Sequence, residues 1–136
     1  MLIKLKSIQQ IIFYEVKMYL KVNDGNKDWY YKFADKKEIT IGRGSSNDIV
    51  LKAEGVSRIH LKVLDEAGEF FIEDQGATNG TFINDEKVEP KSKISFNTFF
   101  PVQLGFFAKL HLCDESNISA LEDQVAKTIE DLKFEE

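Results

Sequence analysis

Short runs of apolar residues, each broken by polar or turn-forming residues, fill the chain from residue 18 to residue 112. Runs of this length and spacing are typical of the strands of a sandwich or barrel, and no long helical period interrupts them. The pattern predicts an all-β fold, an antiparallel β-sandwich of about 10–11 short strands. The expected strands cover residues 19–23, 29–33, 38–41, 49–51, 60–64, 69–73, 81–83, 93–96, 102–104 and 106–112.

Turn-forming residues separate these runs at positions 24–26, 65–68 and 84–85. Asn84-Asp85 predicts a two-residue hairpin, because Asn and Asp adopt left-handed backbone angles more readily than most side chains. The eleven phenylalanines are large and apolar, and we expect them to supply core volume.

The C-terminal segment has a different period. Apolar residues recur every three or four positions, which predicts an amphipathic helix of about five turns with a capping box at its start. The apolar positions are Ile118, Leu121, Val125, Ile129 and Leu132, and the capping pair is Ser119 and Glu122.

The N-terminal segment fits two structures. Ile3 and Leu5 alternate as in a strand, whereas Leu5, Ile8, Ile11 and Ile12 would line one side of a helix. The sequence leaves both open. The expected division is an N-terminal extension over 1–17, a sandwich over 18–113 and a helical segment over 114–136.

Charge and composition narrow the class of protein. Eighteen basic residues stand against 23 acids, a net charge of −5, which argues against nucleic acid or an anionic membrane as the main partner. Any anion-binding site must therefore be local. The single Cys113 excludes an internal disulfide framework, and with only His60 and His111 we expect no metal and no cofactor.

Charged and polar residues interrupt the first seventeen positions before any membrane-spanning run accumulates, and no signal peptide or anchor is readable. We expect a soluble protein in a reducing, cytoplasmic setting.

Three polar clusters fall between the expected strands, at residues 42–48, 56–60 and 74–81. Loops at the end of a rigid sandwich are natural recognition sites. Two guanidinium groups, of Arg43 and Arg58, can make charge-assisted bonds to a phosphate, and hydroxyls and glycine-exposed backbone N–H groups add donors. A phosphate monoester carries about −1.5 to −2 charge at pH 7, so one or two arginines roughly match it.

Each cluster taken singly has an ordinary explanation. A Gly-Arg pair leaving a strand is usually a turn with a solvated charge, and Asn79-Gly80 is an ordinary turn dipeptide. His60 begins an apolar strand and fits a hydrogen-bonded structural histidine better than a ligand or a base. The order and spacing of all three clusters carry the functional signal.

The elements that match one family pattern are Gly42-Arg43, Asn47-Asp48-Ile49, Ser57-Arg58-Ile59-His60, Asp74 and the run Thr-Asn-Gly-Thr-Phe-Ile-Asn at 78–84. In this order they resemble the forkhead-associated (FHA) domain, over about residues 18–112. The resemblance implies a β-sandwich that binds phosphothreonine-containing protein segments in signalling and has no catalytic residues. The partner's identity and the oligomeric state are not readable.

The resemblance also implies roles for individual residues. Arg43 and Ser57 would contact the phosphate, with Thr78 and Arg58 completing its cradle. Asn79 would read the peptide backbone, since a carboxamide offers a donor and an acceptor together.

Four further residues would support this site without touching the ligand. Gly42 precedes the phosphate-binding arginine, and His60 would brace the loop that holds Ser57. Gly80 and Thr81 would set the turn that presents Asn79.

Two departures from the family pattern stand out. Asp85 occupies a position where the family usually has glycine, and the turn before the penultimate strand reads Asn-Thr-Phe-Phe-Pro at 97–101. Phe99 and Phe100 in that turn fit a contact surface or a core role equally.

Other functions are weaker readings. The alternative is a phosphate-independent scaffolding or oligomerisation protein that uses the C-terminal helix and the Phe99–Phe100 surface. No Gly-x-Ser-x-Gly elbow, P-loop or His-Glu-x-x-His motif is present, and Cys113 is far from His60 in sequence, so we expect no enzyme. The acidic balance argues against nucleic-acid binding.

Overall fold

The computed structural model describes residues 2–6, 11–15, 17–33 and 35–115, with only the backbone described in the first two ranges. The predicted C-terminal helix lies outside the described residues. The N-terminal segment, left open by the sequence, contains β1 (Leu2–Lys6) and β2 (Ile11–Glu15), which pair antiparallel with each other.

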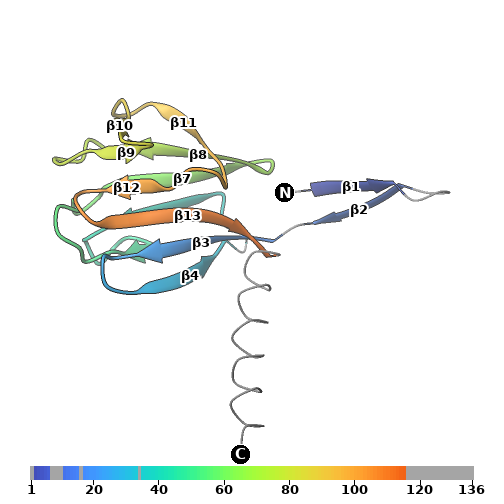
Figure 1. The fold of residues 1–136 in the computed structure, drawn as a ribbon, viewed down its shortest axis with the longest axis horizontal. Coiled ribbons are helices and arrows are strands. Elements are labelled where there is room, and N and C mark those ends of the chain that lie inside the picture. Colours follow the sequence, from blue (N-terminus) through green and yellow to red (C-terminus); the bar gives the residue numbers. More distant parts are fainter. Residues whose placement is uncertain (1, 7–10, 16, 34, 116–136) are drawn as a thin grey trace, which may run out of the picture.

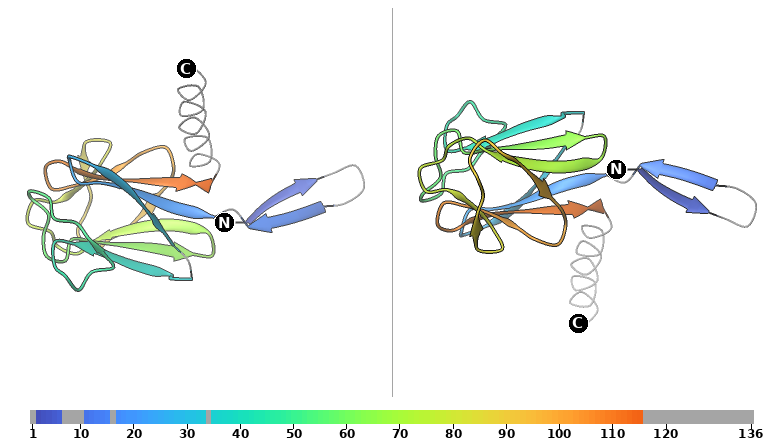
Figure 2. Two further views of the ribbon diagram at one scale, coloured as in Figure 1. Left: turned by 90° about the horizontal axis from the view of Figure 1, so that it is seen from below. Right: turned by 90° about the horizontal axis from the view of Figure 1, so that it is seen from above.

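The remaining strands form two sheets stacked as a sandwich (Figures 1 and 2). One sheet has six strands in the order β10-β9-β12-β13-β3-β4, and the other has five in the order β11-β8-β7-β5-β6. Within this sandwich β5 and β6 are parallel and the other neighbours antiparallel. The predicted all-β sandwich is confirmed. The strands are β3 (Met18–Asn23), β4 (Asp28–Lys32), β5 (Glu38–Gly42), β6 (Ile49–Val50), β7 (Leu61–Glu66), β8 (Glu69–Asp74), β9 (Thr81–Ile83), β10 (Glu86–Lys87), β11 (Lys93–Phe96), β12 (Val102–Leu104) and β13 (Ala108–Asp114).

The core lies between the sheets and follows the period of two expected of strands with one buried face. In β3, Leu20 and Val22 are fully buried, whereas the alternating residues Tyr19, Lys21 and Asn23 are partly exposed. The core is built mainly from Leu, Ile and Val. The expectation that phenylalanines supply the core volume is largely wrong. Phe33, Phe70 and Phe96 are buried, but Phe99, Phe100, Phe106 and Phe107 lie in turns and are exposed.

Three of the predicted strands, β9, β11 and β12, have the predicted bounds. The prediction that Phe106 begins a strand is wrong. Leu104 pairs directly with Ala108, so residues 105–107 close a hairpin, and Gly105 takes the positive φ of 64° that the turn requires. The prediction that His60 opens a strand is also wrong, since β7 begins one residue later.

Strand direction gathers the polar loops at one end of the sandwich. β7 runs from next to His60 to the β7–β8 turn, and β13 runs from the 105–107 hairpin to Asp114. Asp114 pairs with Met18, and the Glu115 N–H donates to the Lys17 carbonyl at 3.0 Å. The chain therefore enters and leaves the sandwich at the end opposite the polar loops (Figure 1).

The predicted two-residue hairpin at Asn84-Asp85 is confirmed. Ile83 pairs with Glu86, and the two residues between them have φ values of 50° and 64°. Positive φ at both positions defines the type I′ turn, whose twist matches that of the flanking strands.

Replacing Asp85 by glycine is expected to raise the free energy of unfolding by about 0.5–1 kcal/mol. The left-handed conformation costs a side chain about 1–2 kcal/mol, and the greater chain entropy of glycine offsets only part of that cost. Thermal unfolding followed by circular dichroism should show a rise in Tm of several degrees. Glu86→Gly, in the adjoining strand, is the control and should lower Tm; a lowered Tm for Asp85→Gly would contradict the strain assigned to the turn.

Candidate functional site

The first and second polar loops touch through their backbones. The Arg43 N–H donates to the Ser57 carbonyl at 2.9 Å, and the Gly44 N–H donates to the Arg58 carbonyl at 3.0 Å. Gly42 lies under this contact, and a Cβ added to it would stand 2.2 Å from the Arg58 carbonyl oxygen. Only glycine permits so close an approach, so the residue before Arg43 sets the distance between the loops.

Asn47 links the same two loops and was not singled out as a site residue from the sequence. Its side chain is 8% exposed, and its Nδ2 donates to the carbonyls of Gly44 at 2.8 Å and Arg58 at 2.7 Å. An Asn inside a Ser- and Gly-rich loop is a signal for such side-chain-to-backbone bonding, although its partner lies eleven residues away.

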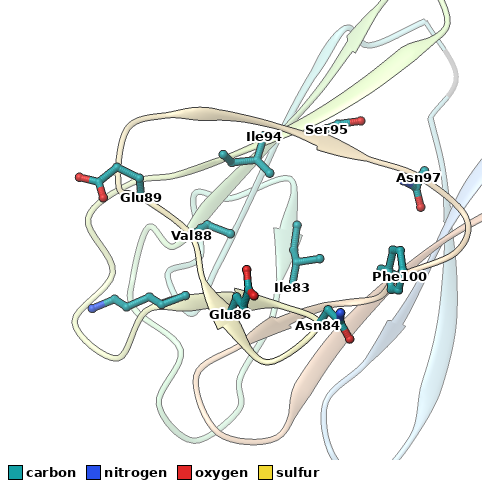
Figure 3. Close-up of a pocket in the computed structure, with 10 residues that line it drawn as sticks. Ile83, Asn84, Glu86, Val88, Glu89, Ile94, Ser95, Asn97 and Phe100 are labelled. Carbon is teal, nitrogen blue, oxygen red and sulfur yellow. The ribbon is translucent and has the colours of Figure 1, made fainter.

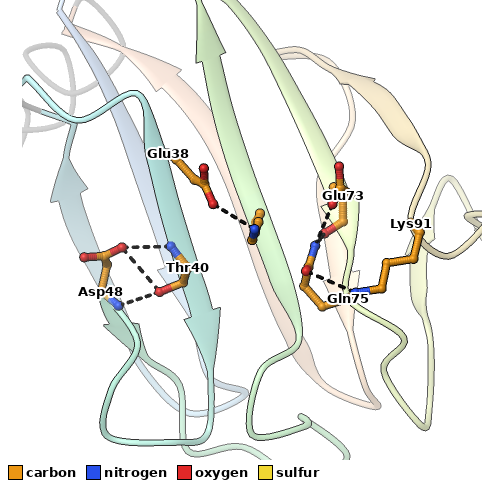
Figure 4. Close-up of polar contacts among 7 residues, drawn as sticks. Glu38, Thr40, Asp48, Glu73, Gln75 and Lys91 are labelled. Atoms are coloured by element: carbon orange, nitrogen blue, oxygen red, sulfur yellow. Dashed lines mark hydrogen bonds and ion pairs between the residues drawn. The ribbon is translucent and has the colours of Figure 1, made fainter.

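Asp48, at the end of the first loop, forms hydrogen bonds with Thr40 of β5 (Figure 4). Its carboxylate accepts the Thr40 N–H at 2.9 Å, and its own N–H donates to the Thr40 hydroxyl at 3.0 Å. A hydrogen bond and ion pair with Lys36 lower the pKa of this carboxyl. Asp48 is thus placed to hold the start of β6 beside β5.

His60 joins the second loop to the third. Its ring is fully buried, and its Nδ1 accepts the Ser57 N–H at 3.0 Å. The other ring nitrogen, Nε2, then carries the proton and lies 3.0 Å from the Gly80 carbonyl, to which it donates. Burial lowers the pKa of His60, which favours the neutral ring that this pair of bonds requires.

Asp74 organises the third loop from inside. Its side chain is 1% exposed and accepts the Thr81 hydroxyl at 2.6 Å, with further bonds from the N–H groups of Gly76 at 2.8 Å and Ala77 at 3.2 Å. Gly80 closes the turn at a φ of 80°. The exposed residues 78 and 79 therefore lie on a loop that buried hydrogen bonds hold in shape.

Three of the predicted ligand-binding residues come together directly. The Ser57 Oγ accepts the Thr78 N–H at 3.1 Å, and the Arg43 and Ser57 backbones are bonded as described above. The Arg43 Nε donates to the Val56 carbonyl at 3.1 Å, which orients an otherwise exposed guanidinium group.

The other two predicted residues lie on the same loops. The Arg58 backbone carbonyl takes part in the loop contacts, and its side chain is exposed. Asn79 is also exposed, and its Nδ2 donates to the Gly55 carbonyl at 3.1 Å.

The β12–β13 hairpin also reaches these loops, a neighbour that sequence reasoning missed. The Phe106 N–H donates to the Glu54 carbonyl at 3.4 Å, and the Phe106 ring covers Gly55, where an added Cβ would lie 3.0 Å from it. The predicted strand over 106–112 concealed this hairpin.

The Phe99–Phe100 pair lies elsewhere, in the β11–β12 turn. Phe99 is 81% exposed and Phe100 is 47% exposed, so the structure favours a surface role over a core role. Phe100 lines a hollow of about 380 Å³ whose apolar walls include Ile83, Val88 and Ile94 (Figure 3).

In the described part of the chain, no helix is long and apolar enough to span a membrane, and no group of three or more His, Cys, Asp or Glu side chains is arranged to hold a metal ion.

Comparisons with a family model and with known proteins agree on one family. The model of the FHA domain matches residues 39–105. FhaB of Mycobacterium tuberculosis is 29% identical over 87 residues, which cover 64% of this chain and 55% of that protein. The oxoglutarate dehydrogenase inhibitor of Corynebacterium glutamicum is 35% identical over 78 residues, 57% of this chain and 52% of that protein. The chain thus spans about half the length of these two relatives.

Solved structures agree with the sequence match. The FHA domain of the CT664 protein from Chlamydia trachomatis superposes with a TM-score of 0.65 at 27% identity, over 72% of this chain and 97% of that one. The FhaA FHA domain, solved in complex with the intracellular domain of Rv3910, superposes with a TM-score of 0.60 at 25% identity, over 71% of this chain and 99% of that one. The matched sequence, the sandwich and the order of the three loops together identify residues 39–105 as a forkhead-associated domain.

Proposed function

We propose that this chain binds phosphothreonine-containing protein segments and acts as a non-catalytic adaptor in signalling. One observation carries the proposal: Arg43, Ser57 and Thr78 come from three separate loops and are joined by hydrogen bonds at one end of a rigid sandwich. Donors already held in place lose little conformational entropy when a ligand binds.

The phosphate would lie against these three residues. Ser57 Oγ accepts a bond from the Thr78 N–H, so its own hydroxyl hydrogen can turn to a phosphate oxygen. Arg43 is fixed through Nε, and its terminal nitrogens can form the paired, charge-assisted bonds that guanidinium groups make to phosphate.

Arg58 and Asn79 would complete the ligand contacts. Arg58 adds a second exposed positive charge beside Ser57. On the third loop, the Asn79 carboxamide is held in place by its hydrogen bond to the Gly55 carbonyl. Its Oδ1 can accept a backbone N–H from an extended ligand, whatever the ligand's sequence.

Two structural neighbours support this proposal. One, at 25% identity and a TM-score of 0.60, comes from an analysis of phosphothreonine-dependent FHA domain interactions. The other, the FhaA domain, was solved with the intracellular domain of Rv3910 as its partner. The setting that we propose for this binding is cytoplasmic.

The test is a fluorescence-anisotropy titration with degenerate peptide libraries that carry phosphothreonine, phosphoserine or unphosphorylated threonine. Phosphothreonine peptides should bind and unphosphorylated ones should not. Phosphoserine peptides should bind about fourfold more weakly if the missing methyl loses its burial energy of about 0.8 kcal/mol. Equal binding of phosphorylated and unphosphorylated libraries would overturn the proposal and turn attention to the Phe99–Phe100 surface.

A further inference from the structure

A second hollow, of about 480 Å³, lies on the outer face of the six-stranded sheet. Lys21 of β3 and Lys109 and His111 of β13 line it, with the exposed rings of Phe106 and Phe107 at its border. The strand register pairs His111 with Lys21, and Lys109 lies two residues before His111 on the same strand. These three side chains therefore share one face of the sheet.

The hollow carries an excess of positive charge on a chain whose net charge is −5. Asp28, also in the lining, lies 3.9 Å from Lys21 and accepts a hydrogen bond from Asn23 at 2.6 Å. Lys109 makes no ion pair within the described residues. One carboxylate thus faces two ammonium groups, and the hollow favours an anionic ligand.

The positive charge of the hollow also acts on His111. Its Nδ1 is buried and has no hydrogen-bond partner among the described residues. Burial lowers the pKa of His111, Lys21 and Lys109 lower it further, and Asp28 acts in the opposite direction. An anion beside the two lysines would reverse their effect and raise this pKa.

The aromatic pair connects the hollow to the candidate phosphopeptide site. Phe106 covers Gly55, whose carbonyl holds the Asn79 side chain. Phe107 packs against Gly25, also in the lining, and the two rings meet edge to face with centroids 6.4 Å apart. An extended ligand that followed these rings away from Asn79 would approach Lys21 and Lys109, advancing by about 3.3 Å with each residue.

We propose that this hollow is a second subsite for the same bound polypeptide, which takes an acidic or phosphorylated side chain at a fixed spacing from the phosphothreonine. Lys21 and Lys109 supply the charge, and Phe106 and Phe107 cover the apolar stem of the ligand residue. The inference rests on the proposed phosphothreonine binding and adds the class of partner, one with an acidic group near its phosphorylated threonine.

The experiment scans a single glutamate along both sides of a phosphothreonine peptide that otherwise has neutral flanks. At one or two positions the glutamate should tighten binding to the native protein by about two- to fivefold, the range expected of exposed ion pairs. Phosphoserine at the same position should tighten it further, since it carries more charge.

The variant Lys21→Gln with Lys109→Gln should lose this gain while binding the neutral-flanked peptide as the native protein does. The matched control is Lys37→Gln with Lys62→Gln, which removes the same charge away from the hollow and should keep the gain. A gain that survives Lys21→Gln with Lys109→Gln, or no gain at any position, overturns the inference.

NMR titration of His111 provides an independent readout. The acidic peptide should raise its pKa, and the neutral-flanked peptide should leave it unchanged; no difference between the two peptides would also overturn the inference. Failure of the neutral-flanked phosphopeptide to bind at all would instead contradict the proposed function, so the two failures are distinguishable.

Discussion

Arg43→Ala is expected to weaken binding of a phosphothreonine peptide by about 2–5 kcal/mol, roughly 30-fold or more in Kd. The phosphate would lose the guanidinium group that lies between the first two loops, and alanine offers no donor in its place. The side chain is exposed and, among the described residues, makes one hydrogen bond, to the Val56 carbonyl, so the fold should persist. Fluorescence anisotropy gives the loss of affinity, and circular dichroism verifies that Tm stays within a few degrees.

Arg43→Lys and Lys52→Ala sharpen this experiment. Lysine keeps the positive charge but has only one nitrogen. It cannot donate to the Val56 carbonyl and also form two parallel bonds to the phosphate, so it should recover only part of the affinity. Lys52 is an exposed cation on the loop before Ser57, and its removal should change Kd by less than about threefold. If Arg43→Ala binds as well as Lys52→Ala, the phosphate does not occupy the assigned site.

The sequence was a good guide to the strands because one face of each sheet is buried and the apolar residues alternate accordingly. It was a poorer guide to which apolar residues are buried. The apolar character of Phe106 and Phe107 predicts a strand, yet Gly105 turns the chain just before them. A short apolar run does not by itself distinguish the residues of a strand from those of a tight hairpin turn.

The contacts that bring the polar loops together could also be predicted only in part from the sequence. Motif order brought out Arg43 and Ser57, but the contacts that hold them involve backbone carbonyls, which have no sequence signature. Asn47 illustrates this: its partner is the Arg58 carbonyl, and only the fold brings the two together. Asp85 shows the reverse case, where local chemistry alone predicted a hairpin that the structure contains.

His60→Ala is expected to lower the free energy of unfolding by about 3–5 kcal/mol. Removing the ring leaves the Ser57 N–H and the Gly80 carbonyl without their partner, each at a cost of about 1–3 kcal/mol, and opens a cavity in a fully buried position. Urea unfolding measures the loss. It is a large part of the 5–15 kcal/mol that typically stabilises a domain.

His60→Phe separates the two causes, because the slightly larger phenyl ring leaves no cavity and makes neither hydrogen bond. If the bonds dominate, this variant should remain about 2–3 kcal/mol less stable than the native protein. It should also bind phosphothreonine peptides more weakly despite an intact Arg43, since the loops that carry Ser57 and Gly80 would no longer be joined. His111→Phe, at a partly exposed ring, is the control and should cost under about 1 kcal/mol. Native-like stability and affinity in His60→Phe would show that packing alone, and not the ring's two hydrogen bonds, holds the site together.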